Sequence, residues 1–398
     1  MKNIILIVAA LLLGFVEKPT NETRFSNPQF AGATPRLTTD HRNNPVLSWT
    51  EKAGEKVHFY YAVSEDGGRT FGEKIRVKSP TVFSTHAEGM PKVAFKKDGT
   101  VLATFEVSRP TAEAPRAGDL LFVTSTDGGQ TWTEPKAVHR DTTPGKGHSF
   151  SNLSRLPNGE IGIVWLDEKA PGQEGRTVKF VQTVAGGGFD REVLVDDNAC
   201  QCCRTRVFVD TQNRIHLAYR DLLDNGARDI SHAVSTDGGR TFTRPKVVYN
   251  DQWKVNACPH TGPDIAQVGN ELFVTWFSGG DKAPGIKLAK LGATELVAGI
   301  VSVRTKHPQV AAVDGQLIWV WDESMELKSP GGESRFIQRI GMRKIVGGKA
   351  QPITYLTPTD VNASFPVLLA TKKGLLVAYE QQKSQQNSVI VSRWVESF

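Results

Sequence analysis

The sequence predicts an all-β fold, a single β-propeller of four-stranded antiparallel blades, on three observations. One octapeptide, Ser-x-Asp-Gly-Gly-x-Thr-aromatic, occurs three times, at Ser64–Phe71, Ser125–Trp132 and Ser235–Phe242. Each copy lies inside a longer repeat of about 50 to 60 residues, and repeats of that length are typical of stacked architectures. No apolar pattern with a helical period follows the first 20 residues. Repeated units of short strands therefore stack into one ring.

Each octapeptide is predicted to form a tight hairpin turn. Its Asp can fold back onto backbone amides, a Gly can take positive φ at low cost, and the aromatic residue can pack under the hairpin. These residues form turns, so no chemistry is assigned to them.

Seven units can be traced along the chain, and they are expected to form the blades of one domain over residues 21–398. They span 35–77, 89–138, 149–195, 204–248, 261–303, 306–356 and 364–398. The seventh unit lacks a fourth strand, and residues near Phe25 to Ala33 are expected to supply it. Such closure removes exposed sheet edges. Six blades remain the alternative if one of the weaker units is miscounted.

The amino-terminal segment and the net charge limit the location and the partners that the sequence allows. Thirteen apolar residues, Ile4 to Val16, follow a short basic start, and a membrane-spanning helix needs about 20. Residues 1–20 are therefore predicted to be a secretory signal peptide, or else a short anchor, and the protein periplasmic or secreted. A net charge of +6 without a basic run argues against nucleic-acid binding. No further membrane span is expected, and the chain is expected to be a monomer.

A polar mouth is predicted on one face of the ring. If the octapeptides join third and fourth strands, the opposite face carries the loops that lead into each first strand. These leading loops hold four of the nine histidines and all four cysteines. The second strands end in acids on the same face. The residues are His86, His148, His260, His307, Cys200, Cys202, Cys203 and Cys258, with the acids Glu51, Glu106, Asp167, Asp221, Asp322 and Glu380. Any one of them could be a hydrogen-bonded loop residue or a turn cap; their shared repeat position indicates a site.

The octapeptide is the Asp box, and the chain resembles the sialidase (neuraminidase) superfamily. That resemblance implies a propeller and a site in which three arginines bind the substrate carboxylate. It also implies a tyrosine nucleophile activated by a glutamate, and an aspartate that acts as general acid and base. Arg36, in Pro35-Arg36-Leu37, matches the family's first arginine. Arg204 and Arg220 could add guanidinium groups, and Glu51, Tyr379 and Glu380 are further catalytic candidates. The family's early aspartate has no counterpart, since His86 and Glu88 occupy that loop.

Three functions stay open at this point. In the first, the mouth binds or hydrolyses a small-molecule or glycan ligand through Arg36, with His86, Glu88, His148, Arg220, His260 and His307 as ligand-binding residues. In the second, it holds copper or zinc on the four histidines, because imidazole and thiolate are ligands of both metals. The cysteines could join that site or form a disulfide between the loops of Cys200–Cys203 and Cys258. A protein-interaction scaffold without a small-molecule site is the third possibility.

Overall fold

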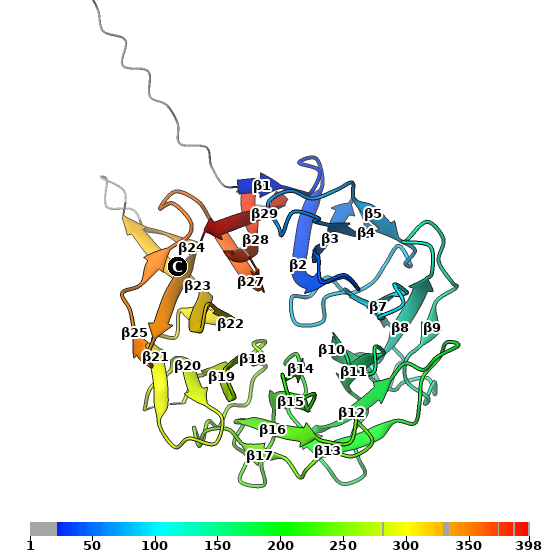
Figure 1. The fold of residues 1–398 in the computed structure, drawn as a ribbon. Coiled ribbons are helices and arrows are strands. Elements are labelled where there is room, and N and C mark those ends of the chain that lie inside the picture. The colour runs from blue at the N-terminus through cyan, green and yellow to red at the C-terminus, as the bar shows by residue number, and fades with distance from the viewer. Residues whose placement is uncertain (1–21, 281, 329–333, 373, 385–386, 397–398) are drawn as a thin grey trace, which may run out of the picture.

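The computed structural model describes residues 22–280, 282–328, 334–372, 374–384 and 387–396. The predicted signal segment 1–20 lies outside them. Seven antiparallel sheets stand around a common axis (Figure 1), so the seven-bladed propeller is confirmed. Within the described residues, no helix has the length and apolarity to cross a membrane.

The strands follow the repeats in order, innermost first. Blade 1 is β2 (Ala31–Thr39), β3 (Pro45–Ala53), β4 (Lys56–Val63) and β5 (Ile75–Val77). Blade 2 is β6 (Lys92–Phe95), β7 (Val101–Ser108), β8 (Gly118–Ser125) and β9 (Lys136–Ala137). Blade 3 is β10 (Ser149–Arg155), β11 (Ile161–Leu166), β12 (Arg176–Gln182) and β13 (Val193–Ala199). Blade 4 is β14 (Arg206–Val209), β15 (Ile215–Arg220), β16 (Ile230–Ser235) and β17 (Lys246–Val247).

The remaining blades complete the ring. Blade 5 is β18 (Asp264–Val268), β19 (Glu271–Ser278), β20 (Gly285–Lys290) and β21 (Leu296–Val301). Blade 6 is β22 (Thr305–Val313), β23 (Gln316–Lys328), β24 (Ser334–Val346) and β25 (Lys349–Ala350), with β26 (Thr354–Tyr355) beside β24. Blade 7 is β27 (Ala363–Thr371), β28 (Gly374–Ser384), β29 (Asn387–Glu396) and β1 (Glu22–Arg24).

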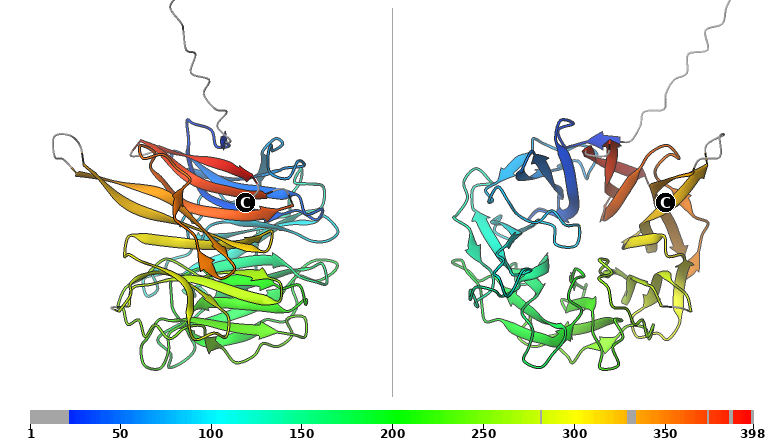
Figure 2. Two further views of the ribbon diagram at one scale, coloured as in Figure 1. Left: turned by 60° about the vertical axis from the view of Figure 1, so that its left-hand side comes forward. Right: turned by 180° about the vertical axis from the view of Figure 1, so that it is seen from behind.

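The ring closes in blade 7, where β1 pairs antiparallel with β29. The right-hand view of Figure 2 shows the amino-terminal strand, in blue, beside the red strands near the carboxyl end of the chain. The amino-terminal origin of the closing strand is therefore confirmed. The strand, Glu22–Arg24, directly precedes the predicted region near Phe25 to Ala33, because Ala31–Ala33 already pair with β3 as part of the innermost strand of blade 1.

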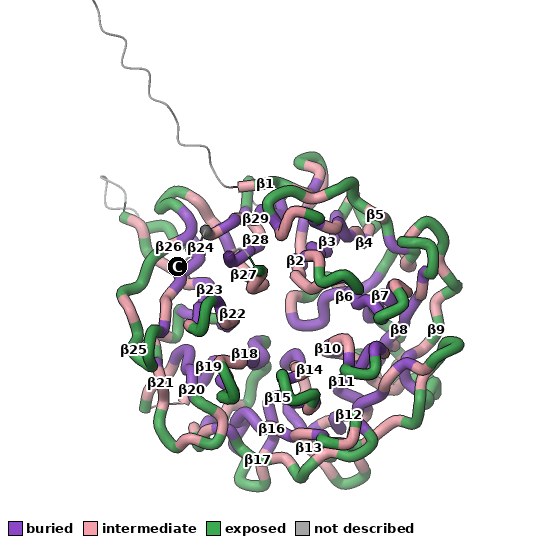
Figure 3. Tube along the Cα trace, in the orientation of Figure 1, coloured by how far each residue is buried: buried purple, intermediate pink, exposed green. Residues whose placement is uncertain are grey.

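Aromatic residues of the second strands hold neighbouring blades together. Five tryptophans on these strands are fully buried: Trp49, Trp165, Trp276, Trp319 and Trp321. Inner and second strands are mostly buried, whereas the outer edge of the ring is exposed (Figure 3). Burial of large aromatic rings between sheets contributes strongly to the stability of such a ring. The core thus surrounds the axis without filling it.

The Asp boxes join third and fourth strands, as predicted. In the box at Ser235, the Asp237 carboxylate accepts hydrogen bonds from the Thr241 backbone N–H (3.0 Å) and the Thr241 hydroxyl (2.6 Å). The Gly239 N–H donates to Ser235 Oγ at 2.9 Å, and Gly239 takes φ of 88°. The other two boxes repeat this pattern, so the box is a turn device on the face opposite the leading loops.

The Asp boxes are expected to make the fold acid-sensitive. Hydrogen bonds from Thr131 and Thr241 hold the pKa of Asp127 and Asp237 well below the usual range. Unfolding returns these groups to an ordinary pKa of about 3.9. Their stabilisation is therefore full above that value and is lost as the pH falls below it. Thermal midpoints from pH 6 to pH 3 should fall less steeply in Asp127→Asn/Asp237→Asn than in the parent. Asp224→Asn, at an exposed position, should keep the parent's slope, and an unchanged slope in the double variant would contradict this account.

Candidate functional site

A cavity of about 760 Å³ runs along the axis of the ring and is lined by the innermost strands. All seven blades contribute to it, through β2, β6, β10, β14, β18, β22 and β27. A volume between about 300 and 1,000 Å³ is typical of small-molecule sites. The cavity is therefore the candidate functional site.

A recurrent backbone bulge shapes its wall. The register of the innermost strand shifts in blades 1, 3, 6 and 7. Each shift contains a non-glycine residue with φ between 49° and 57°: Thr34, Phe150, His307 and Phe365. Bulges of this kind redirect side chains and concentrate near functional sites. The residue two positions beyond each bulge lines the cavity, and in blade 1 that residue is Arg36.

Three of the predicted acids hold these bulges in place. Glu380 accepts from the Thr34 N–H at 2.7 Å, Glu106 from the Phe150 N–H at 2.6 Å, and Asp322 from the Phe365 N–H at 2.8 Å. Each acid thus joins the end of one second strand to the first strand of the next blade. Carboxylate-to-amide bonds of this kind are charge-assisted and strong.

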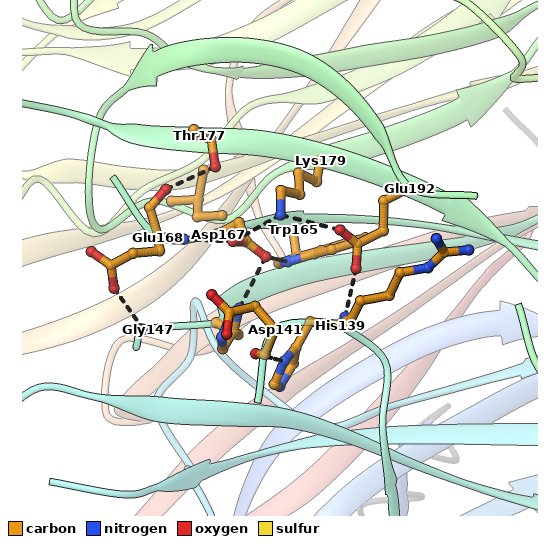
Figure 4. Close-up of polar contacts among 12 residues, drawn as sticks. His139, Asp141, Gly147, Trp165, Asp167, Glu168, Thr177, Lys179 and Glu192 are labelled. Carbon is orange, nitrogen blue, oxygen red and sulfur yellow. Dashed lines mark hydrogen bonds and ion pairs between the residues drawn. The ribbon is translucent and has the colours of Figure 1, made fainter. Parts of the chain in front are cut away.

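The other acids also bond inside the wall. Asp167 accepts from Trp165 Nε1 (2.6 Å), His148 Nδ1 (2.9 Å) and Lys179 Nζ (3.2 Å). Figure 4 shows the dashed contacts that join Asp167 to Trp165 and Lys179. Glu51 is fully buried against Trp49 and Lys74. These contacts place the carboxylates within the blades.

The leading loop of blade 2 reaches across the ring to the leading loops of blades 4 and 5. The Glu88 carboxylate is fully buried and pairs with the Arg204 guanidinium. It also accepts from the backbone N–H groups of Arg204 (3.0 Å) and Gly262 (2.7 Å), in blades 4 and 5. Burial alone would raise the pKa of Glu88, but the charge of Arg204 and these N–H groups hold it below its ordinary value. Ala87 and Met90 of this loop line the cavity.

Positive charge dominates the cavity wall. The charged lining residues comprise five cations and one carboxylate: Arg36, Lys92, Arg155, Arg204, Arg206 and Asp264. Arg206 pairs with Asp264 at 2.8 Å, and Arg204 pairs with Glu88. Arg36 donates to the Leu153 carbonyl (3.0 Å) and Lys92 to the Met90 carbonyl (2.5 Å). Among the described residues, the half-buried Arg36 and the fully buried Lys92 therefore have no carboxylate partner within ion-pair distance.

Burial lowers the pKa of both Arg36 and Lys92. Burial, then the charges of Arg206 and Arg204, lower the pKa of Arg36 to about 9. Burial, then the charge of Arg36, lowers the pKa of Lys92 to about 7. Burial raises the pKa of the neighbouring Glu106 to about 7. An anion in the cavity would relieve this repulsion.

The predicted catalytic residues are not gathered in one place. Arg36 and Arg204 line the cavity, whereas Tyr379 is buried with its hydroxyl 3.1 Å from Glu22 Oε1. Glu380 follows Tyr379 along β28 and holds the Thr34 bulge. Arg220 is fully buried and donates to the carbonyls of Thr261 (3.1 Å) and Phe277 (2.7 Å). Among the described residues that line the cavity there is no tyrosine.

The four leading-loop histidines separate into three environments. His86 and His260 are exposed, with ring centroids 4.6 Å apart. His307 donates to Asp322 at 2.8 Å and lines the cavity. His148 is buried, bonds to Asp167, and stacks on His139 with centroids 3.5 Å apart. Within the described chain, no three of these histidines bring ligand atoms together.

All four cysteines are described, and all are free thiols, so the disulfide expected between the two loops is not formed. Cys200, Cys202 and Cys203 are buried, and Cys258 is exposed. The sulfur atoms of the buried three lie within 4.8 Å of one another. Cys202, Cys258 and His260 form a second group within the same limit. The two predicted cysteine loops are therefore in contact.

Sequence reasoning missed Lys92, Arg206 and Asp264. It concentrated on the leading loops, whereas these residues begin the innermost strands just after those loops. Aligning the innermost strands at their last residues could have found Lys92 and Arg206, because each lies three residues before the end of its strand, as Arg36 does in blade 1.

A closed seven-bladed ring with Asp-box turns and a cationic axial cavity defines the class of this protein. The family of BNR repeat-like domains matches residues 49–258, and the chain belongs to that family, as its resemblance to sialidase-type propellers predicted. No curated protein sequence matches it.

Two solved structures share the fold. The BP39L lectin from Burkholderia pseudomallei is 11% identical, with a TM-score of 0.57 over 92% of this chain and 97% of the lectin. The polysaccharide lyase Uly1 is 10% identical, with a TM-score of 0.55 over 97% of this chain and 94% of the lyase. At these identities the similarity concerns the fold alone.

Proposed function

We propose that the axial cavity binds an acidic carbohydrate and that Arg36 and Lys92 are the main contacts for its anionic group. The observation that carries this proposal is a fully buried lysine and a half-buried arginine that have no carboxylate partner among the described residues, in a cavity whose described lining holds a single acid. Guanidinium groups bind carboxylates through two parallel hydrogen bonds, which gives both affinity and orientation. An anionic ligand would therefore balance the excess of positive charge in this wall.

The family and the cavity size support a sugar as the bearer of that anion. The fold is shared with a protein named as a lectin and another named as a polysaccharide lyase. A cavity of about 760 Å³ can enclose one or two sugar rings. We therefore propose a monosaccharide or disaccharide unit that carries a carboxylate.

Binding is favoured over hydrolysis. Most glycoside hydrolysis needs two carboxylates on either side of the scissile bond, and the sialidase variant needs a tyrosine. Among the described lining residues, Asp264 is the one carboxylate, and it is paired with Arg206. Tyr379 points to Glu22, away from this lining. The proposed function is accordingly that of a carbohydrate-binding propeller.

Calorimetric titration with matched sugars tests this function. Glucuronic acid, galacturonic acid and N-acetylneuraminic acid are each compared with their methyl esters, which keep the ring and remove the charge. At least one acid should bind, and its ester should bind far more weakly. Equal binding of acid and ester would overturn the proposed role of the cations, and a lack of binding by all acids would overturn the proposed ligand class.

Binding is expected to weaken as the pH rises through about 7. Lys92 has a pKa of about 7 in the free protein, and a bound anion favours its protonated form. Affinity is therefore highest below that pH and falls by up to about tenfold per unit above it. Arg36, Arg204, Glu88 and Glu106 are the charged groups that act on Lys92, and ionisation of Glu106 changes affinity in the same direction.

Lys92→Met should remove much of this pH dependence. The variant keeps the length of the side chain and removes its charge. Titrations between pH 6 and pH 9 should show weaker binding at pH 6 and a flatter profile than the parent. If the affinity of the parent protein rises from pH 6 to pH 9, the assignment of Lys92 as a contact for the anionic group is wrong.

We also propose that residues 1–20 direct export, since their short basic start and apolar run are typical of a signal peptide. The mass of the chain recovered outside the cytoplasm would show whether this segment is removed. Recovery of the full-length chain in the cytoplasm alone would contradict export.

A further inference from the structure

A second cluster of reactive groups lies on the leading-loop face, outside the proposed sugar site. Cys202 belongs to both sets of close ligand atoms, one with Cys200 and Cys203 and the other with Cys258 and His260. None of these five residues lines the axial cavity. They come from the leading loops of blades 4 and 5, and the fold of the ring brings these loops together.

The two loops are held in position by partners outside the cluster. Arg220 accepts from the Cys200 N–H at its carbonyl (3.0 Å) and donates through its guanidinium to the Thr261 carbonyl (3.1 Å). Glu88 binds the N–H groups of Arg204 and Gly262, directly after Cys203 and two residues after His260. The thiols are thus placed by buried contacts that do not depend on a metal. Because the ligand residues are already held in place, they lose less conformational entropy when a metal ion binds.

We propose that this cluster is a binding site for a soft monovalent metal ion, Cu(I), held by Cys202, Cys258 and His260 with Cys200 and Cys203 behind them. In a trigonal site with sulfur ligands about 2.3 Å from the ion, two sulfur atoms lie about 4 Å apart. The observed limit of 4.8 Å requires only a small contraction of the loops. Thiolate and imidazole are ligands that soft ions prefer.

Ligand number and charge favour Cu(I) over Zn(II). Structural zinc almost always takes four ligands in a tetrahedron, whereas each close set here has three members, a number that suits Cu(I). Three arginines also surround the sulfur atoms. Arg228 donates to Cys200 Sγ at 3.2 Å, and Arg220 and Arg176 interact electrostatically with the cysteines. A monovalent ion on two thiolates keeps a net negative charge that these arginines can balance, whereas a divalent ion would cancel it.

The exposure of two of the ligands also allows an ion to enter and leave the site. Cys258 and His260 are exposed, whereas Cys202 is buried beneath them. An ion or its carrier can reach the exposed pair first and then bind the buried sulfur. Thiolate exchange between partners of this kind requires no opening of the ring.

Transfer of copper from a chelator tests the site. The full chain is reduced, freed of oxygen and titrated with Cu(I) supplied as its bicinchoninate complex, and the loss of the chelator colour reports transfer. We expect one equivalent to transfer, with X-ray absorption showing sulfur and nitrogen neighbours. Because Cys258 and His260 are exposed, Cys258→Ser and His260→Ala should fold normally and lose this transfer. His41→Ala, at an exposed histidine in the β2–β3 turn, should retain it.

Three results would overturn the proposal. The first is a failure of the fully reduced chain, with four thiols detected by a thiol reagent, to take copper from the chelator. The second is preferential retention of Zn(II) when both ions are supplied. The third is a Cys202–Cys258 disulfide in peptides of the native protein that resists mild reduction, since these thiols would then be unavailable. Sugar titrations of Cys258→Ser separate this site from the axial cavity, because acid binding should persist there.

Discussion

Replacing Glu88 with alanine is expected to lower the free energy of unfolding by about 3 to 5 kcal/mol, the range for removing one partner of a buried ion pair. Glu88 is fully buried and holds blades 4 and 5 from a loop of blade 2. Its loss leaves the Arg204 guanidinium buried without a carboxylate, and leaves two backbone N–H groups without their acceptor. Each of these costs stability.

Urea denaturation of the parent and the variants measures this effect. Glu73→Ala changes an exposed glutamate of the same chain and should alter stability by no more than about 0.5 kcal/mol. Glu88→Met/Arg204→Met replaces both partners with apolar side chains and should recover the part of the loss that comes from the unpaired guanidinium, whereas the two backbone N–H groups still lack their acceptor. A loss below about 1 kcal/mol in Glu88→Ala would show that the loop is not held by this ion pair.

Reversing the charge of Arg36 is expected to abolish acid binding in the axial cavity. Truncating one member of a buried charge pair costs about 2 to 5 kcal/mol, which corresponds to at least about 30-fold in affinity. Arg36→Glu adds repulsion to that loss. The new carboxylate would lie near Arg204 and Arg206, which already act electrostatically on Arg36, so the fold should tolerate it.

Two matched variants separate the local charge from the overall charge. Arg244→Glu makes the same change at an exposed position between β16 and β17 and should leave acid binding unchanged. Arg36→Lys keeps a positive charge but loses the planar two-hydrogen-bond geometry, so its affinity should fall between those of the parent and Arg36→Glu. Unimpaired binding by Arg36→Glu would exclude Arg36 as the main contact.

The fold was predictable because its signals are local. The octapeptide specifies a turn through its own Asp, Gly and Thr, and three copies gave the repeat length that revealed the weaker units. The bounds of the closing strand were less predictable because Ala31–Ala33 suit either blade, and their pairing with β3 depends on the ring as a whole.

The site was less predictable because it depends on which side chains meet across the ring. Glu106, Asp322 and Glu380 look like a ring of reactive acids in sequence, yet each binds a backbone amide of the next blade. His148 shares its repeat position with His260 but turns into the wall to meet Asp167. Lys92 carries no motif, and its position beside Arg36 appears only when blades 1 and 2 curve around the axis.

Locating a bound acidic sugar tests the central claim most directly. Crystals are soaked with the acid that binds most tightly in calorimetry, and the position of its carboxylate is determined. The account predicts the carboxylate inside the axial cavity, within hydrogen-bond distance of Arg36 and close to Lys92. A carboxylate bound on the outer surface of the blades or on the Asp-box turns, with the cavity free of sugar, would contradict it.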